Sequence, residues 1–195
     1  MSRLPRKLSS IVLGLLAVLA LAACGDSHTK VTTGTYAGES GANAPYLQVG
    51  PLKYEVQLSR ELNPASSEDA GYLQGLTPLE RQLAPGQEWF GVFLQVYNNG
   101  SVPALAASAV TISDTQGNLY APLIPDPSNP YAYRGGIVPG KGRLPAFDTT
   151  AGFGPTQGAL LLFKIQTVSL DNRPLEVRIV NPVRLTEAAT AELDV

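Results

Sequence analysis

Alternation between apolar and polar residues is the dominant pattern after residue 45. It is regular over 52–59 and 175–179, which is typical of strands that bury one face. Two other segments, 89–97 (WFGVFLQVY) and 159–166 (ALLLFKIQ), are apolar at consecutive positions, as expected of central strands. Shorter strands are expected at 110–113 and 119–121, on either side of a 114–118 turn, and a last short edge strand is expected at 193–195.

One short helix is expected at 78–83. Thr77 has the position of an N-cap, Pro78 that of the first helical residue, and Glu80 follows the cap by three residues. Pro85 and the glycine after it would end this helix.

About seven short strands joined by turns rich in proline and glycine predict an all-β fold, an immunoglobulin-like antiparallel β-sandwich with one short helix, over residues 45–195. The sequence holds one cysteine, so no intramolecular disulfide can form and the fold depends on apolar packing. Trp89 is a candidate core tryptophan. The expected core residues alternate along the two apolar segments: Val92, Leu94, Val96, Leu161, Phe163 and Ile165.

The first 23 residues have the pattern of a secretory signal. Three basic residues precede an apolar run over 11–23, which is too short to span a bilayer. The sequence Leu-Ala-Ala-Cys at 21–24 resembles the lipobox of bacterial lipoproteins. That resemblance implies cleavage before Cys24, a diacylglyceryl group on its sulfur with palmitate among the acyl chains, and a location on the outer face of the cell membrane. An ordinary secretory signal followed by a free cysteine, or an uncleaved single-pass anchor, are the alternatives.

Residues 24–44 are expected to be a flexible tether, because they are rich in glycine, alanine, serine and threonine and lack apolar periodicity. Twenty such residues reach about 22–27 Å on average. Residues 1–23 hold three of the 14 basic residues and none of the 16 acidic ones, so the net charge of the remaining chain is about −5. This balance argues against nucleic acid as a partner.

Five runs resemble segments of a group of actinobacterial lipoproteins that carry a telokin-like, immunoglobulin-like extracellular domain of unknown function. The runs are 54–64 (YEVQLSRELNP), 89–94 (WFGVFL), 114–120 (DTQGNLY), 162–165 (LFKI) and 172–177 (NRPLEV). The resemblance implies a β-sandwich over most of 45–195. It brings no catalytic or binding residues with it.

Catalysis is not expected. His28 is the only histidine and lies in the tether, and Cys24 is expected to be acylated, so the usual nucleophile–base pairs and zinc sites cannot be built. No phosphate-binding loop is present, and no cofactor is expected. Four loop residues with oxygen donors could hold calcium, although such residues more often cap turns: Asp114, Asn118, Asp126 and Asn129.

Residues 121–158 contain seven prolines and seven glycines, and long loops in compact domains are often functional. Tyr131, Tyr133 and Arg134 are therefore the candidate binding residues. In the alternative interpretation the prolines protect sheet edges and the tyrosines cover the core. Arg134, Lys141 and Arg143 form a basic cluster expected to be no more than an exposed face.

Two functions follow from these observations. The first is a lipid-anchored, non-catalytic module that binds an envelope protein or glycan. The second is a small-molecule or glycan-binding lipoprotein that uses the Tyr131–Tyr133 region.

Overall fold

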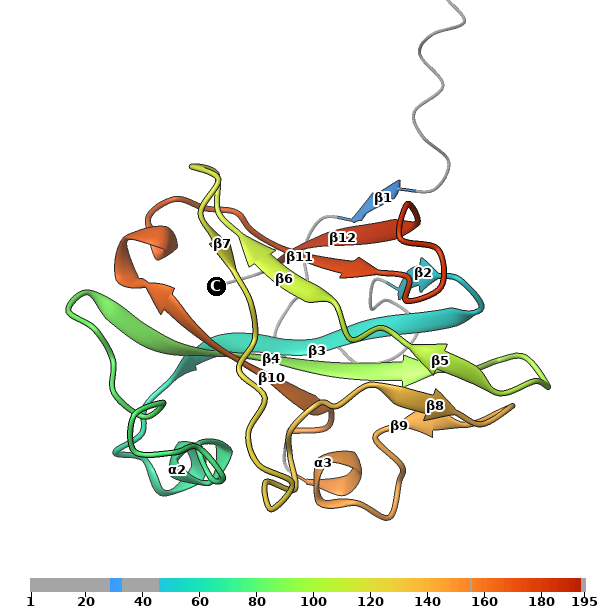
Figure 1. Ribbon diagram of the computed structural model, residues 1–195, viewed down its shortest axis with the longest axis horizontal. Helices are drawn as coiled ribbons and strands as arrows, with labels where there is room; N and C mark the ends of the chain where they lie inside the picture. The colour runs from blue at the N-terminus through green and yellow to red at the C-terminus, as the bar shows by residue number, and fades with distance from the viewer. Residues whose placement is uncertain (1–28, 33–45, 155, 194–195) are drawn as a thin grey trace, which may run out of the picture.

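The structure is a computed structural model that describes residues 29–32, 46–154 and 156–193. Two sheets pack face to face (Figure 1). The first has the order β1-β12-β11-β6-β7, and the second has the order β10-β4-β3-β2 with β9 added to β4. The prediction of an all-β, mostly antiparallel sandwich is confirmed. The strands of the first sheet are β1 (Thr29–Thr32), β6 (Val110–Ser113), β7 (Leu119–Tyr120), β11 (Leu175–Val180) and β12 (Ala188–Leu193).

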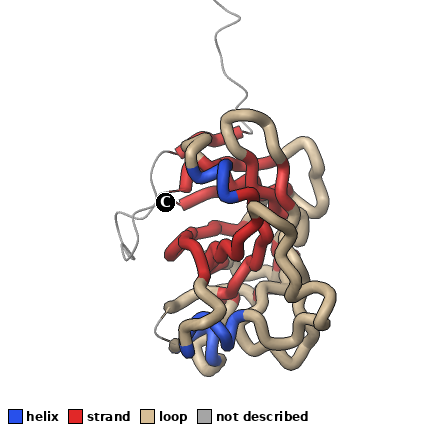
Figure 2. The backbone as a smooth tube through the Cα atoms, turned by 90° about the vertical axis from the view of Figure 1, so that its left-hand side faces the viewer, coloured by secondary structure: helices blue, strands red, loops and turns tan. Residues whose placement is uncertain are grey.

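The second sheet contains the longer strands, and a separate pair of short strands, β5 with β8, extends one end of the sandwich. Short helices, α2 and α3, lie in a third layer of loops on the far side of the second sheet, whereas the 3₁₀ turn η2 lies beside the first sheet (Figure 2). The remaining bounds are β2 (Tyr46–Val49), β3 (Leu52–Leu62), α2 (Ser67–Tyr72), β4 (Gln87–Tyr97), β5 (Ala104–Ala106), β8 (Gly136–Val138), β9 (Arg143–Leu144), α3 (Thr150–Phe153), β10 (Ala159–Gln166) and η2 (Thr167–Leu170).

The main core lies between the two sheets, and all six residues expected there are buried. β4 and β10 pair antiparallel, with Leu161 opposite Val92 and Phe163 opposite Phe90. Side chains alternate between the two faces of a strand, so the apolar residues of one face pack against β6, β11 and β12 of the facing sheet. The core prediction is confirmed.

A second apolar cluster explains why β4 and β10 are apolar on both faces. The outer face of these strands packs under α2 and the loop after β7, and Trp89 is buried there, together with Phe93 and Leu160. Tyr72 of α2 covers Phe93, with ring centroids 5.1 Å apart. The candidate core tryptophan therefore belongs to this outer cluster and not to the space between the sheets.

The alternation expected over 52–59 stops at a β-bulge. Val56 pairs with Leu94 and Leu58 with Phe93, so Gln57 is an extra residue in β3. One inserted residue exchanges the faces of all the residues that follow. Leu58 consequently packs against the outer cluster, whereas Val56 faces the main core.

The prediction of a helix at 78–83 is wrong, because these residues form only a single turn. The capping interactions do form: the backbone N–H of Glu80 donates to the Thr77 hydroxyl at 3.2 Å, and Thr77 N–H donates back to the Glu80 carboxylate at 2.8 Å. However, Leu79 and Leu83 are exposed, so a longer helix would bury no apolar face. The helices that form instead are α2 and α3.

The predicted signal peptide, Cys24 and most of the predicted tether lie outside the described residues. Residues 29–32 of the expected tether form β1, which pairs parallel with β12, Thr29 opposite Ala188. β12 therefore lies between two strands, and it begins five residues earlier than the short 193–195 strand that the sequence predicted. In the part of the chain that the structure describes, no helix has the length and apolar character needed to cross a bilayer.

Candidate functional site

The three candidate binding residues do not share one exposed surface. Tyr133 is buried in the main core, and its hydroxyl donates a 2.7 Å hydrogen bond to the carbonyl oxygen of Ala107. Tyr131 is half-buried and meets the ring of Tyr72 edge-on, with centroids 4.9 Å apart. Arg134 is exposed, and its guanidinium donates to a backbone carbonyl at 2.6 Å. Both tyrosines therefore cover apolar clusters, as the alternative interpretation of this segment expected.

The oxygen donors considered for calcium are engaged in turns. Asp114 is buried and accepts the backbone N–H groups of Gln116 and Asn118 at 3.0 and 2.9 Å. It also accepts the side-chain amide of Asn118 at 2.8 Å and the hydroxyl of Ser169 at 2.7 Å. Burial by itself raises the pKa of Asp114, but these four donors outweigh it and lower the pKa to about 2.

The other two oxygen donors cap a separate turn. Asp126 accepts the backbone N–H of Ser128 at 2.9 Å. Asn129 is buried, with two backbone N–H groups bonded to its side-chain oxygen and two backbone carbonyls to its side-chain nitrogen. These bonds are those of turn caps, and among the described residues no group of three or more histidine, cysteine or acidic side chains is placed to hold a metal ion.

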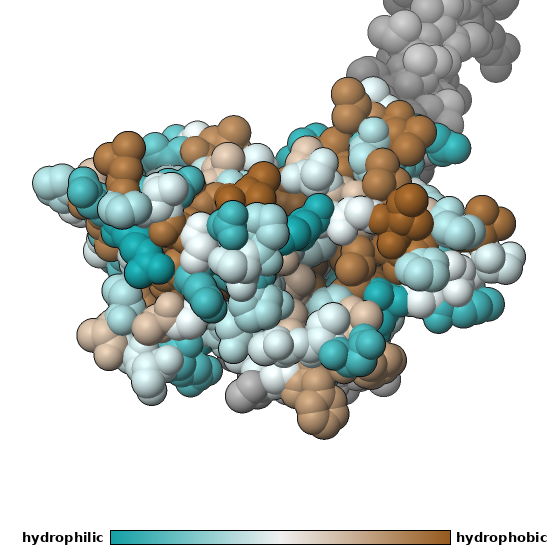
Figure 3. All heavy atoms as spheres, turned by 60° about the horizontal axis from the view of Figure 1, so that its bottom comes forward, coloured by the Kyte–Doolittle hydropathy of each residue, from teal (hydrophilic) through white to brown (hydrophobic). Residues whose placement is uncertain are grey.

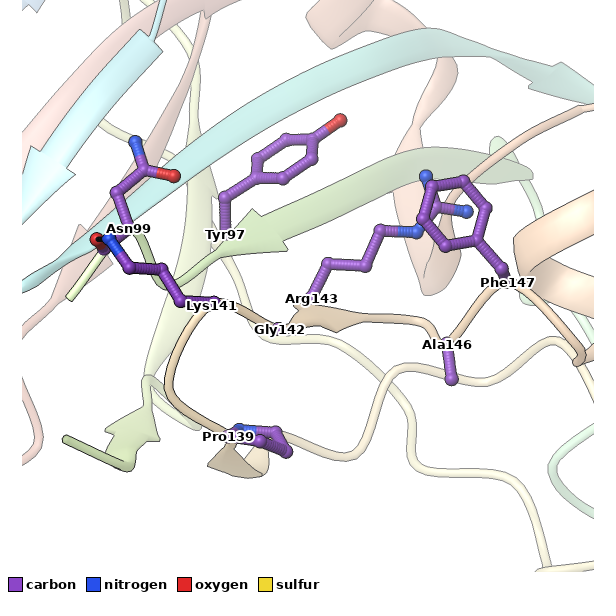
Figure 4. A pocket seen from close by; sticks show the side chains of 8 residues that line it. All are labelled: Tyr97, Asn99, Pro139, Lys141, Gly142, Arg143, Ala146 and Phe147. Carbon is purple, nitrogen blue, oxygen red and sulfur yellow. Dashed lines mark hydrogen bonds between the residues drawn. The ribbon is translucent and has the colours of Figure 1, made fainter. Parts of the chain in front are cut away.

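A pocket of about 500 Å³ lies beside the last residue of β4, where β9 pairs with it (Figure 4). Two aromatic rings, from Tyr97 and Phe147, and two cationic side chains, from Lys141 and Arg143, take part in its lining. Among the described residues that line it, none is acidic. The pocket is thus aromatic and positively charged in a chain whose net charge is negative.

Backbone pairing between β4 and β9 sets the position of the pocket lining. Tyr97 pairs with Arg143 across β4 and β9. The turn before β9 closes with a 2.9 Å hydrogen bond from Gly142 N–H to the Pro139 carbonyl, and Lys141 takes a left-handed conformation in it, with φ 59°. The Lys141 ammonium group donates to the Asn99 carbonyl at 2.5 Å, so it bridges two loops at the rim.

Arg143 is the central cation of the pocket. Its guanidinium carbon lies 3.3 Å from the centroid of the Phe147 ring (Figure 4), a cation–π contact. One terminal nitrogen donates to the Gly152 carbonyl at 2.9 Å and the other to the side-chain oxygen of Gln95 at 3.3 Å. Its Nε is buried and has no hydrogen-bond partner within the described part of the chain. The arginine is therefore held in place while one of its donors stays unused.

A buried polar pair lies behind the pocket wall. Tyr97 donates its hydroxyl to the side chain of Gln95, which is buried. Burial, followed by the nearby charge of Glu55, raises the pKa of Tyr97 to about 12. Glu55 is buried, and its Oε1 has no hydrogen-bond partner among the described residues. Tyr97 therefore stays a neutral phenol at physiological pH.

This arrangement is suited to binding a ligand that joins an acidic group to a ring. A fixed guanidinium recognises carboxylate or phosphate oxygens, and aromatic rings give area for a sugar or aromatic face. Ligand sites commonly combine an apolar lining with a few placed polar groups, as here. The described lining includes no serine, cysteine, histidine or carboxylate that could act as nucleophile or base.

Sequence reasoning noted Lys141 and Arg143 but treated them as an exposed face. It missed Tyr97 and Phe147, because the pocket exists only through the pairing of β9, a two-residue strand, with β4. A basic residue close to an aromatic one, as in Arg143 and Phe147, was the available signal.

Comparisons with known proteins support the fold alone. No protein-family model and no curated protein matches the chain. The crystal structure of YcdA from Bacillus subtilis, a candidate lipoprotein, is similar with a TM-score of 0.50 and 11% identity. The match covers 78% of this chain and 39% of YcdA, so the chain spans about two fifths of that protein.

Two further crystal structures show weaker similarity. An uncharacterized β-sandwich protein from Clostridium difficile matches with a TM-score of 0.44 and 8% identity, over 87% of this chain and 98% of its own. The YjhA protein of Bacillus subtilis matches with a TM-score of 0.45 and 7% identity, over 77% of this chain and 96% of its own.

Proposed function

We propose that the protein is a lipid-anchored component of the bacterial cell envelope whose β-sandwich is a non-catalytic binding module. The diacylglyceryl group would be carried on Cys24, at the outer face of the cell membrane, as the lipobox resemblance implies. The actinobacterial, telokin-like assignment belongs to this proposal as well. Its ligand is an envelope glycan or small molecule that carries an acidic group.

The observation that supports the ligand class is the pairing of Arg143 with Phe147 in the pocket beside Tyr97. The guanidinium and the Lys141 ammonium group place positive charge in the lining, and no lining residue among those described is acidic. The Tyr131–Tyr133 region fits this role less well, because Tyr133 can be reached only if the main core opens.

Lipidation is tested by metabolic labelling with a palmitate analogue. Wild-type protein should carry the label and remain with the membrane, whereas Cys24→Ser should lose the label and release precursor or soluble material. Equal labelling of the two proteins would contradict the anchor.

Ligand class is tested on the full chain with two sugars that differ in one group, glucuronate and glucose. Titration followed by NMR should show that glucuronate binds at least tenfold more tightly than glucose. Arg143→Met keeps the apolar stem of the side chain and should reduce glucuronate binding about 10- to 100-fold, the range for a lost charge-assisted hydrogen bond. Arg178→Met, at an exposed position of β11, is the matched control. Equal binding of the two sugars, or no effect of Arg143→Met, would contradict the acidic-ligand assignment.

A further inference from the structure

One end of the sandwich carries a group of exposed aliphatic side chains. We call it the apolar end: the β2–β3 turn at 50–51, residues 101–103 before β5, β5, β8, and the β11–β12 loop at 181–187. None of these residues lines the pocket beside Tyr97. These elements lie together on the right-hand side of Figure 1. Its large hydrophobic residues are 48–78% exposed: Val102, Leu105, Ile137, Val183 and Leu185. Brown, hydrophobic surface is also visible on the right-hand side of Figure 3.

The exposure of these residues follows from the strand pairing. Leu105 and Ile137 are opposite one another on β5 and β8 and point away from the core, whereas their neighbours Ala106 and Val138 are buried. Beside them, a groove of about 540 Å³ separates β5 from the β11–β12 loop, with Leu105 and Val183 in its lining. The sandwich already has a complete core without these side chains, so their exposure is not explained by folding alone.

The more exposed charge at the apolar end is basic. Its segments contain two charged residues, Arg184 and Glu187. Glu187 has a side chain only 17% exposed and accepts hydrogen bonds from Gly50 N–H at 2.5 Å and from the side-chain amide of Asn181 at 2.9 Å. Arg184 lies 3.9 Å from the Glu187 carboxylate, but its side chain is 76% exposed, so its guanidinium remains accessible from solvent. Exposed aliphatic groups beside an exposed basic side chain match a bilayer surface with anionic headgroups.

The chain enters the sandwich at this same end. β1 runs parallel to β12, and its first residue, Thr29, lies opposite Ala188, which directly follows the β11–β12 loop. Four residues separate Thr29 from Cys24 in the sequence. Because an extended chain advances at most about 3.6 Å per residue, Cys24 is within about 18 Å of Thr29.

We propose that the apolar end rests on the surface of the anchoring membrane, with Val183 and Leu185 inserted at the boundary between headgroups and acyl chains and Arg184 at the level of the lipid phosphates. This proposal rests on the proposed lipidation of Cys24. Because the link between Cys24 and Thr29 is short, the surface that the apolar end contacts is the anchoring membrane itself. Two acyl chains fix the protein to the bilayer, and the apolar end then fixes its orientation. The opposite end, with the β6–β7 hairpin, faces away from the membrane.

Depth-dependent fluorescence quenching tests this orientation. Since Cys24 is acylated in the mature protein, a cysteine introduced elsewhere is the one free thiol for an environment-sensitive fluorophore. Lipidated full-length Val183→Cys and Ile137→Cys are compared with Leu119→Cys, which is 69% exposed on β7 at the opposite end. Each is reconstituted in vesicles of phosphatidylcholine and phosphatidylglycerol at about seven to three, with a nitroxide-labelled lipid as quencher.

Quenching should be at least twofold at residues 183 and 137 and near zero at residue 119. Equal quenching at all three positions, or none at 183, would overturn the orientation. Self-quenching of the residue-183 label in detergent without vesicles would also overturn it, because a second copy of the chain would then cover this end. The anchor is assessed separately. Absence of the palmitate label from wild-type protein would contradict the lipidation. A labelled, membrane-retained protein whose residue-183 fluorophore is not quenched would contradict only the orientation.

Discussion

The hydroxyl of Tyr133 donates a 2.7 Å hydrogen bond to the carbonyl oxygen of Ala107 inside the core. The backbone N–H of Ala107 donates a 2.8 Å hydrogen bond to the hydroxyl oxygen of Tyr54. Ala107 is fully buried, so these two tyrosines supply the hydrogen bonds that water would otherwise provide to its backbone. They tie the connection between β5 and β6 to β3 and to the loop after β7.

Tyr133→Phe should therefore destabilise the protein by about 1–3 kcal/mol, because the Ala107 carbonyl would be left buried without a partner. Ring packing is retained, so the loss measures the hydrogen bond. Tyr131→Phe is the control; it keeps the edge-on contact with Tyr72 and should change the free energy of unfolding by less than about 0.5 kcal/mol. Urea melts monitored by Trp89 fluorescence provide the measurement. Equal effects of the two substitutions would contradict the assigned bond.

Phe163→Ala should cost about 3–5 kcal/mol, the usual range for a large aromatic side chain in a packed core. Phe163 is fully buried on β10, opposite Phe90. Phe153→Ala, at an 82% exposed position, should have little effect on the denaturant midpoint. A loss of unfolding free energy below 1 kcal/mol for Phe163→Ala would show that β10 is peripheral to the core.

The sequence predicted those parts of the fold in which one physical pattern dominates. Continuous apolar runs identified β4 and β10, since a strand buried on both faces has no polar alternation to display. The β6–β7 hairpin was identified by its turn residues, and Asp114 indeed holds that turn through backbone N–H groups.

Other features depend on contacts distant in sequence. β5, β8 and β9 have two or three residues each, too few for any periodicity to be visible. The bulge at Gln57 is set by pairing with β4, and alternation in β3 alone could not show it. The local signals for a helix at Thr77 were present and the cap formed, but no apolar surface was available to extend it.

Candidate sites were harder to predict for the same reason. Tyr131 and Tyr133 have a composition typical of binding surfaces, yet burial in the fold gives them packing roles. Arg143 obtained its aromatic neighbours only through the β4–β9 pairing.

Arg60→Met should destabilise the protein by about 1.5–3 kcal/mol. Both terminal nitrogens of Arg60 bind the carboxylate of Asp69, at 2.6 and 3.0 Å, and Asp69 is buried. The same carboxylate accepts the N–H of Asn63 at 2.7 Å, which fixes α2 to the end of β3. Loss of the guanidinium would leave a buried charge without its main partner. Arg178→Met, on the exposed face of β11, should change the denaturant midpoint very little. Comparable losses in the two variants would mean that the Arg60 pair contributes nothing specific.

Asp114 should give the protein a stability that is lost in acid. Its pKa is about 2 in the folded state, because donors from Asn118, Ser169 and the turn backbone outweigh the effect of burial. In the unfolded chain an aspartate has a pKa of about 3.9, so the folded state favours the charged form. The contribution is therefore fully present above about pH 5, shrinks as the pH falls through the unfolded pKa, and is lost as the pH falls through about 2, with a total of about 2.6 kcal/mol.

Denaturant melts of wild-type protein and Asp114→Asn between pH 7 and pH 2 measure this contribution. The difference in unfolding free energy between them should be constant from pH 7 to about pH 5 and should narrow steadily below that, because the wild-type carboxylate takes up a proton that the amide cannot. Asp148→Asn, at an exposed position, should follow the wild-type curve. A difference that stays unchanged down to pH 2 would show that Asp114 stabilises the hairpin by its shape and its amide-like hydrogen bonds, and not by its charge.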